Sequence, residues 1–227
     1  MLFRSTLLCE GRFFMGHGSG TFRIQPNPRF FKELRDLGYE APNEDQLYDM
    51  LLSPVSLEFA KGVRDAGLDA STSQLLELRN HGISLPYLLS LRESGFETQN
   101  IRDVIDLKNH GVSPEFLVAL RRAGYSDIST SRISDLKNHG ISPMYLRDLE
   151  AYRLKPAVSD LIDFKNHGIQ PEFLRDVREL GYEFTPRELI ELKNQGVDSR
   201  YLRNLRASGI RNLTASQIVK LKAHGIE

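Results

Sequence analysis

Histidine is the residue whose type and spacing in this sequence most readily suggest chemistry. The five histidines that share one place in a recurring Lys-Asn-His-Gly block are His81, His110, His139, His167 and His224. Zinc needs ligand nitrogens at about 2.0 to 2.1 Å, whereas equivalent residues of stacked helices lie about 8 to 10 Å apart or more. Gln195 also interrupts the series, and no Cys, Asp or Glu keeps a fixed ligand spacing beside it. We therefore predict that these imidazoles complete helix ends, and we expect no metal and no cofactor.

The asparagine before each histidine also recurs. The members of this series are Asn80, Asn109, Asn138, Asn166 and Asn194. One such residue per repeat could line a recognition groove, as in helical proteins that read one base per repeat. A recognition code needs variation, however, and this place barely varies. Hydrogen bonding between repeats is the favoured interpretation.

Basic residues provide the candidate binding surface. They occupy two places three residues apart, and hence one helix edge, here called the arginine edge. Its members are Lys32, Arg35, Lys61, Arg64, Arg92, Arg121, Arg147, Arg175, Arg178, Arg203 and Arg206. The predicted binding residues among them are Arg92, Arg121, Arg147, Arg175, Arg178, Arg203 and Arg206. Such a stripe could follow a phosphate backbone or an acidic partner.

The alternative is that acidic residues within each repeat neutralise this stripe. The acids that keep one fixed place are Asp49, Glu77, Asp106, Asp135, Asp163 and Glu191. The zero net charge and the lack of an exposed aromatic series for base stacking favour this alternative. The aromatic series from Phe30 to Tyr201 has the spacing of an apolar face and is predicted to lie in the core.

The remaining chemical candidates are weaker. The segment 16–20, Gly-His-Gly-Ser-Gly, lacks the Gly-Lys-Ser/Thr ending of a phosphate loop and is predicted to be a turn. His17 and Ser19 have no third residue to orient them as a base and a nucleophile. Cys9, the single cysteine, cannot form an internal disulfide, and we predict a buried thiol rather than a reactive one.

The histidine, asparagine, acidic and basic series belong to a sequence unit that recurs about every 28 or 29 residues and contains two helical segments. Side chains suited to N-caps, often with Gln or Glu three residues later, begin the segments, and glycines end them. The predicted caps of the first segment are Asn43, Ser71, Asn100, Ser129, Thr185 and Thr214, and those of the second are Asn27, Ser56, Ser84, Ser113, Ser142 and Asp198.

One such hairpin of short helices cannot bury its apolar faces, but a stack of hairpins can. We therefore predict an all-α fold, a right-handed αα-hairpin repeat solenoid preceded by a short β-hairpin. Residues 1–25, with two short apolar runs around the glycines, form the hairpin, which either caps the solenoid or is the remnant of a larger β domain. Residues 26–227 form about six to seven repeats.

One repeat is irregular. Glu150 replaces the arginine, Arg153 the closing glycine and Ala157 the cap, and Pro156 intrudes. Because an arginine in the left-handed region costs about 1 kcal/mol or more, we expect this helix to end differently. The array would bend here, or a partner would bind.

Charge and hydropathy exclude some classes of protein. Thirty basic residues balance thirty acidic ones in the chain of 227 residues, so no overall field attracts nucleic acid or anionic lipid. No apolar run approaches the roughly 20 residues of a membrane span, and the start of the chain is a poor secretory signal. We expect a soluble chain without membrane insertion, cytoplasmic if the sequence is complete.

The repeats, together with the lead-in from Gly16 to Pro28, resemble the C-terminal helical repeats of bacterial membrane zinc-metallopeptidase proteins of the β-lactam-sensor type. The resemblance extends from about Gly16 onward. It implies an accessory, bacterial sensing or protein-binding segment. The peptidase motif His-Glu-x-x-His does not occur in this sequence, so the resemblance transfers no catalytic role to any residue.

The framework is strictly kept and no set of titratable residues converges. The sequence therefore predicts a non-catalytic protein interaction or scaffold module with a protein partner, rather than an enzyme. Binding of nucleic acid or of another anionic partner along the arginine edge is the alternative function.

Overall fold

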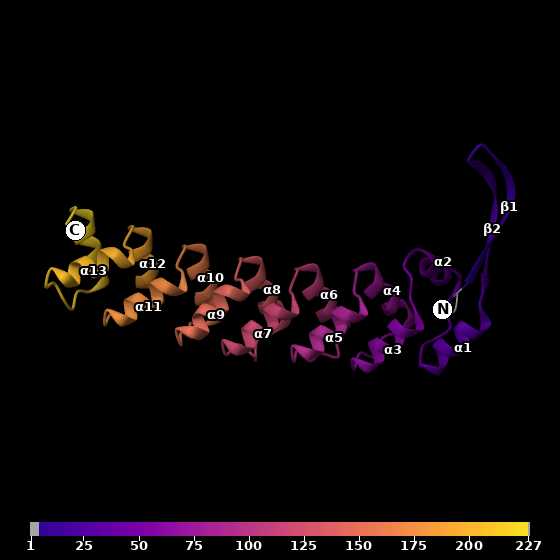
Figure 1. Cartoon of the computed structure of the whole chain (residues 1–227), viewed down its shortest axis with the longest axis horizontal. Coiled ribbons are helices and arrows are strands. Elements are labelled where there is room, and N and C mark those ends of the chain that lie inside the picture. Colours follow the sequence, from indigo (N-terminus) through magenta and orange to yellow (C-terminus); the bar gives the residue numbers. More distant parts are fainter. Residues whose placement is uncertain (1–4, 227) are drawn as a thin grey trace. The chain divides into compact units, whose positions relative to one another are not determined.

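The computed structural model describes residues 5–226, which form a β-hairpin followed by fourteen helices (Figure 1). The chain divides into two compact units, an N-terminal unit that ends at Asn109 and a C-terminal unit that begins at His110. Among residues 5–226, none of the helices has the length and apolar character that crossing a membrane requires.

Every helix is nine residues long. The odd-numbered helices correspond to the second segment of each repeat, and they are α1 (Pro28–Asp36), α3 (Leu57–Asp65), α5 (Leu85–Glu93), α7 (Pro114–Arg122), α9 (Pro143–Ala151), α11 (Pro171–Glu179) and α13 (Ser199–Ala207). The even-numbered helices correspond to the first segment, and they are α2 (Glu44–Leu52), α4 (Thr72–Asn80), α6 (Ile101–Asn109), α8 (Thr130–Asn138), α10 (Val158–Asn166), α12 (Pro186–Asn194) and α14 (Ala215–Ala223).

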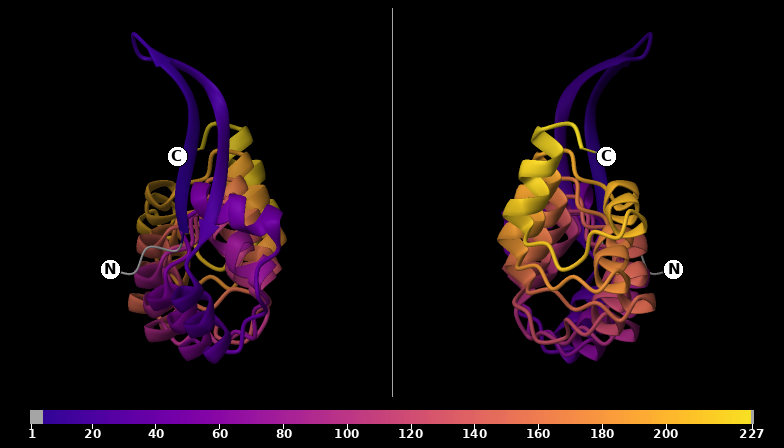
Figure 2. Two further views of the ribbon diagram at one scale, coloured as in Figure 1. Left: turned by 90° about the vertical axis from the view of Figure 1, so that its right-hand side faces the viewer. Right: turned by 90° about the vertical axis from the view of Figure 1, so that its left-hand side faces the viewer.

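Within each compact unit, odd-numbered helices pack on odd-numbered helices and even-numbered on even-numbered ones, which produces two layers (Figure 2). In the C-terminal unit, for example, α7, α9, α11 and α13 are successive neighbours, as are α8, α10, α12 and α14. The predicted helical repeat array is therefore confirmed. Its core lies between the layers and includes the predicted aromatic series, represented by the fully buried Phe30 and Phe116.

The helix ends follow the predicted capping chemistry. Asn43, Ser71, Thr185 and Thr214 each form a full capping box with the Gln or Glu three residues later. Ala157, at the irregular repeat, provides no side-chain hydrogen bond. The histidine of the Lys-Asn-His-Gly block is the C-cap of α4, α8, α10 and α14, as His139 is for α8. Most helices therefore begin and end at the predicted capping residues.

The histidines and asparagines of the block hydrogen-bond to each other between successive repeats. The Nδ1–H of each imidazole donates to the Oδ1 of the asparagine one repeat later, at 3.0 to 3.1 Å. The pairs are His81 with Asn109, His110 with Asn138, His139 with Asn166, and His167 with Asn194. At the next step both partners change, because Gln195 replaces histidine and Ala223 replaces asparagine. The hydrogen bonding predicted for this asparagine position is confirmed.

The lysine of the same block packs against the aromatic series. Lys137 Nζ lies 5.7 Å from the ring centroid of Phe116, and Lys193 Nζ lies 5.4 Å from that of Phe173. Equivalent contacts join Lys108 to Tyr87, Lys165 to Tyr145 and Lys222 to Tyr201. These lysines attach α6, α8, α10, α12 and α14 each to the odd-numbered helix before it through a cation–π contact, and Arg79 of α4 makes the same contact with Phe59 of α3.

The N-terminal hairpin pairs β1 (Ser5–Phe14) with β2 (His17–Pro26) in antiparallel register. Met15 and Gly16 form its turn, with φ of 46° and 82°. The Phe22 ring stacks on Tyr48 of α2 at 6.3 Å, which attaches the hairpin to the helices of its unit. Cys9 is exposed, so the predicted burial of its thiol is wrong. A ribbon of two strands has no second layer in which to bury it.

The expectation that α9 ends differently is also wrong. Arg153 takes the glycine's place with φ of 52°, and its N–H donates to Glu150 O at 3.0 Å while Leu154 N–H donates to Leu149 O at 2.8 Å. These two hydrogen bonds reproduce the closure found after the other odd-numbered helices. The Tyr125 hydroxyl adds a hydrogen bond to Pro156 O at 2.7 Å. The surrounding contacts therefore outweigh the strain at Arg153.

A double-mutant cycle tests the hydrogen bonds between repeats. We expect His139→Ala and Asn166→Ala each to lower the free energy of unfolding by about 1 kcal/mol, and the double variant to lose clearly less than the sum. Urea denaturation followed by circular dichroism measures the three variants. Gln195→Ala is the control, because Gln195 holds the histidine position at the step where Ala223 replaces the asparagine partner. It should change stability by less than about 0.5 kcal/mol. Strict additivity would contradict the pairing.

The strain at Arg153 gives a second prediction. Arg153→Gly should raise the free energy of unfolding by up to about 1 kcal/mol, because glycine adopts positive φ without a Cβ clash. Thermal unfolding measures the effect. Tyr152→Gly, one residue earlier at negative φ, is the matched control and should destabilise. A loss of stability in Arg153→Gly would show that the arginine side chain contributes more than its backbone strain costs.

Candidate functional site

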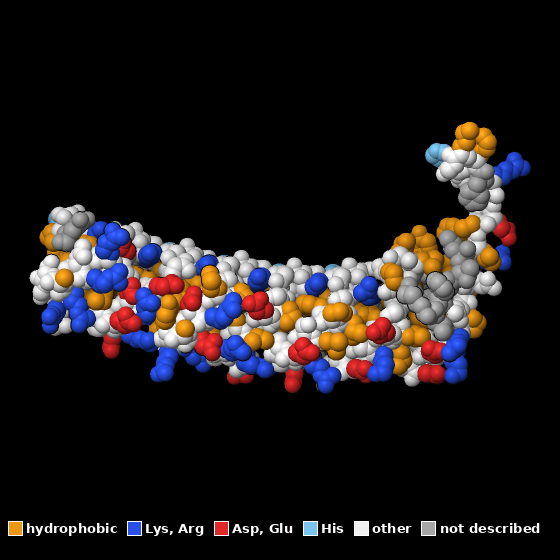
Figure 3. Space-filling model, viewed as in Figure 1, with side chains coloured by type: hydrophobic (Ala, Val, Ile, Leu, Met, Phe, Trp, Pro, Cys, Tyr) orange, Lys and Arg blue, Asp and Glu red, His pale blue; other side chains and the backbone are white. Residues whose placement is uncertain are grey.

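The arginine edge occupies the fifth and eighth positions of the odd-numbered helices, as Arg175 and Arg178 do in α11. Its members are largely exposed, and in Figure 3 basic and acidic side chains alternate over much of the visible face. The hydrogen-bond and ion-pair partners at each position show which of these charged side chains are available to bind a ligand.

The eighth-position arginines donate to main-chain carbonyls at the end of the preceding odd-numbered helix. Arg92 Nη1 donates to Asp65 O at 3.2 Å, Arg178 Nη1 to Arg153 O at 3.2 Å, and Arg206 Nη1 to Glu179 O at 3.5 Å. Those carbonyls have no partner within their own helix and carry the negative end of its dipole. The position therefore joins repeats, and Arg121 holds the same place on α7.

The fifth-position residues form ion pairs within their own layer. Lys32 pairs with Asp36, and Lys61 pairs with Asp65. Arg147 Nη2 lies 3.4 Å from Glu115 Oε1, on the preceding odd-numbered helix. The ion pairs that the structure shows for the edge thus run to acids of the odd-numbered helices or, from Arg64, to Asp69 just after α3. The pairing predicted with the acids from Asp49 to Glu191 is therefore wrong. Those acids lie on the even-numbered helices, which form the other layer.

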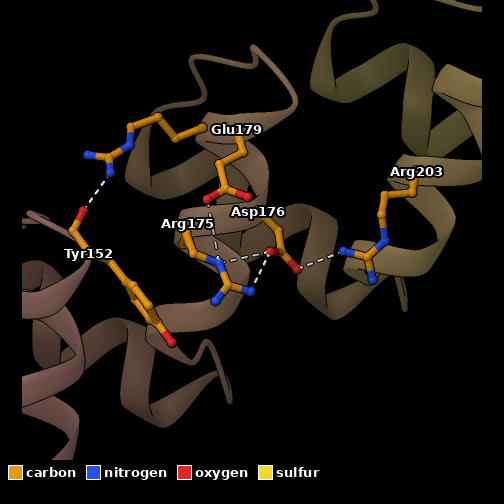
Figure 4. A network of polar contacts seen from close by, with 6 residues as sticks. Tyr152, Arg175, Asp176, Glu179 and Arg203 are labelled. Atoms are coloured by element: carbon orange, nitrogen blue, oxygen red, sulfur yellow. Dashed lines mark hydrogen bonds and ion pairs between the residues drawn. The ribbon is translucent and has the colours of Figure 1, made fainter.

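The most extensive network surrounds Asp176, the buried acid of α11 (Figure 4). Its Oδ1 accepts from Arg175 Nη2 at 2.7 Å and its Oδ2 from Arg203 Nη1 of α13 at 3.0 Å. The Arg175 guanidinium also lies 4.7 Å from the ring centroid of Tyr152, at the end of α9. The structure thus brings the predicted residues Arg175 and Arg203 together around one carboxylate, linking three successive repeats.

Burial by itself would raise the pKa of Asp176. Hydrogen bonds from Ser199, Arg175 and Arg203 outweigh that effect, and the pKa of the carboxyl is lowered below its ordinary value. The ionised carboxylate is therefore favoured in the folded state. Its contribution to stability is present above the ordinary aspartate pKa of about 3.9 and is lost as the pH falls through the lowered value.

Within the described part of the chain, three clefts open beside eighth-position arginines. The Arg92 cleft has a volume of about 490 Å³ and is lined by residues that include Arg92, Phe96, Glu97, Leu88 and Val104. The Arg178 cleft has about 380 Å³ and is lined by residues that include Arg178, Lys155, Tyr182, Phe184 and Leu174. The Arg206 cleft has about 330 Å³ and is lined by Leu180, Gly181, Tyr182, Arg206, Ile210, Arg211 and Asn212.

The Arg92 and Arg178 clefts share a frame. In both, the apolar floor comes from the fourth and seventh positions of an odd-numbered helix, Leu88 and Leu91 or Leu174 and Val177. An aromatic residue follows the closing glycine in both, Phe96 or Tyr182. The rims differ, since Phe184 adds a second ring that stacks on Tyr182 at 5.0 Å. Sequence reasoning missed these clefts, although the aromatic residue after the glycine was a visible signal.

The side chains described in residues 5–226 include no group of three or more His, Cys, Asp or Glu that could hold a metal ion. The chain matches no protein-family model, no curated protein and no solved structure. The clefts and the arginine edge are thus the features of the molecule on which a functional argument can rest.

The Asp176 network provides a prediction with a pH signature. We expect Asp176→Asn to lower the free energy of unfolding by about 2 kcal/mol at pH 7, because two charge-assisted hydrogen bonds are weakened. The difference from the parent protein should shrink as the pH falls below about 4, where the carboxyl of the unfolded parent chain gains a proton, and vanish as the pH falls through the lowered pKa of the folded carboxylate. Urea denaturation at several pH values measures both effects.

Asp148→Asn, at the equivalent place in α9, is the matched control. It should change stability by less than about 0.5 kcal/mol. A difference between Asp176→Asn and the parent that does not vary with pH would contradict the role given to the ionised carboxylate.

Proposed function

We propose that this chain is a non-catalytic protein-interaction module, whose clefts hold side chains of an extended partner segment. The observation that carries the proposal is that a cleft with a constant frame and a variable rim recurs in both compact units. Repeat proteins build binding surfaces in this way, since the frame fixes the stacking and the remaining positions are open to variation.

The residues that recur in most repeats are already engaged inside the molecule. His139 hydrogen-bonds to Asn166, Lys137 lies over Phe116, and Arg92 donates to a helix end. A ligand that used these groups would have to displace those contacts. Recognition is therefore best served by the positions that differ between repeats, and these lie on the rims of the clefts.

The Arg178 cleft is the best suited to anchor an apolar or aromatic side chain. Its volume of about 380 Å³ falls in the range of small-molecule pockets, and Leu174, Val177 and Phe184 line it. Buried aromatic and apolar anchors of this kind carry most of the energy in protein interfaces. Lys155, Arg178 and Glu183 around them would select among partner residues by charge.

The same contacts weigh against nucleic acid as the partner. Arg92 and Arg178 are committed to main-chain carbonyls, and Arg147 and Arg203 to carboxylates. The aromatic series that could stack on bases is largely buried beneath lysines. An origin among the accessory repeats of bacterial membrane metallopeptidase proteins is a hypothesis that agrees with a binding role.

A peptide-display selection on the purified chain tests the proposal. We expect a family of related peptides, and we expect Phe184→Ala to weaken their binding at least about tenfold, because the cleft loses its second ring. Phe14→Ala is the matched control, since Phe14 is exposed on the hairpin and lies outside the three clefts. Fluorescence anisotropy gives the affinities, and circular dichroism confirms that each variant is folded.

Equal binding by the parent and Phe184→Ala would contradict the assignment to this cleft. A gel shift in which DNA or RNA binds at low salt, and is released steeply as salt rises, would favour the alternative function.

A further inference from the structure

Two positions five residues apart carry a charge pattern along the array. They are the eighth position of each odd-numbered helix and the second residue after its closing glycine. The pairs of opposite charge are Arg35 and Glu40, Arg64 and Asp69, Arg92 and Glu97, and Arg178 and Glu183. The irregular repeat reverses the signs, with Glu150 and Lys155. At Arg121 the second position is the uncharged Ser126, and the last pair, Arg206 and Arg211, has two positive charges.

The structure shows what the acidic member does. Arg64 forms an ion pair with Asp69 in the N-terminal unit. Glu97 lines the Arg92 cleft, and Glu183 lines the Arg178 cleft. The Arg92 and Arg178 clefts are therefore each lined by a carboxylate as well as by an arginine.

The Arg206 cleft differs in this respect. Among the described residues that line it, two are arginines and none has a carboxylate. Arg206 also has the longest of the carbonyl contacts in its series, 3.5 Å to Glu179 O against 3.2 Å for Arg92 and Arg178. A guanidinium has five N–H donors, so this one contact uses little of what Arg206 can offer.

The cleft also has an apolar wall. Leu180, Tyr182 and Ile210 line it beside the two arginines. The pKa of Tyr182 is raised by burial, and the positive charge of Arg206 opposes that rise, which places the guanidinium near the phenol ring. Two cations beside an aromatic and aliphatic wall complement an acidic residue followed by an apolar one.

We propose that the Arg206 cleft binds a carboxylate side chain of an acidic partner segment, and that the next residue of that segment packs on Leu180, Tyr182 and Ile210. This proposal rests on the protein-binding function proposed above and names the chemistry of one partner residue. A guanidinium can hold a carboxylate through two parallel hydrogen bonds. A cationic cleft in the same array as the acid-containing Arg92 and Arg178 clefts fits one carboxylate better than a continuous phosphate backbone.

The probes are two acetylated, amidated peptides, Gly-Glu-Phe-Glu-Gly and its counterpart Gly-Gln-Phe-Gln-Gly, together with inorganic phosphate. Nuclear magnetic resonance titration of the labelled full chain measures binding. The acidic peptide should shift the resonances of Tyr182, Arg206 and Asn212, and the glutamine peptide should bind about tenfold more weakly. Phosphate binding at this cleft without binding of the acidic peptide would overturn the proposal.

Two reciprocal variants make the test specific. Arg211→Glu introduces the charge pair found at Arg92 and Arg178 and should reduce binding of the acidic peptide at least about tenfold. Glu97→Arg gives the Arg92 cleft two positive charges and should create new binding there. Both sites are exposed, and circular dichroism confirms folding. Equal binding of the acidic peptide by the parent and Arg211→Glu would overturn the assignment.

The two proposals fail in different ways. In one outcome, Phe184→Ala abolishes binding of the display-selected peptides, whereas Arg211→Glu changes binding neither of these peptides nor of the acidic peptide. That outcome would support the interaction module and contradict only the carboxylate site. An absence of peptide binding in the parent protein would contradict both proposals.

Discussion

A nine-residue helix is too short to be stable in water, so every helix here depends on the equivalent helix of the neighbouring repeat. Close stacking sets strict limits on what can lie between them. At Gly62 of α3, a Cβ would come within 2.2 Å of Leu85 Cδ1 of α5, so the side chains of adjacent repeats approach without spare room. The rest of the architecture follows from this constraint, because a residue in one repeat must fit a residue about 28 positions away.

The same constraint explains the repeated polar residues. Stacking brings helix ends side by side, and the polar groups there acquire partners from the next repeat. His139 donates to Asn166, and Arg178 donates to the carbonyls of Tyr152 and Arg153. The partners differ at the two ends of the series: Asn80 accepts from the Ser53 hydroxyl in place of a histidine, and Gln195 and Ala223 replace both members at the last step. The block that first suggests chemistry is therefore a means of joining repeats.

The repeated polar groups are occupied in contacts between repeats, so the chemical differences along the array come from the positions that vary between repeats. Clefts that share the same apolar floor differ in the residues at their rims. The charge pair beside the closing glycine is kept, reversed or lost from repeat to repeat. A protein partner that lies along such clefts would meet a different chemical surface at each step. This combination of constant packing and variable rims is the physical basis for proposing an interaction module.

The sequence by itself determined the repeat, the helix ends and the core, because capping and apolar periodicity act between residues within a few positions. Asn43 with Gln46 and the buried Phe116 are examples. Only the tertiary structure decided that Asp176 rather than Glu191 meets the arginines, that Arg153 keeps the glycine's conformation, and that Cys9 is exposed. Each of these depends on which layer a side chain faces and on what the neighbouring repeat provides there. The clefts are of the same kind, since no single repeat contains all the residues that line them.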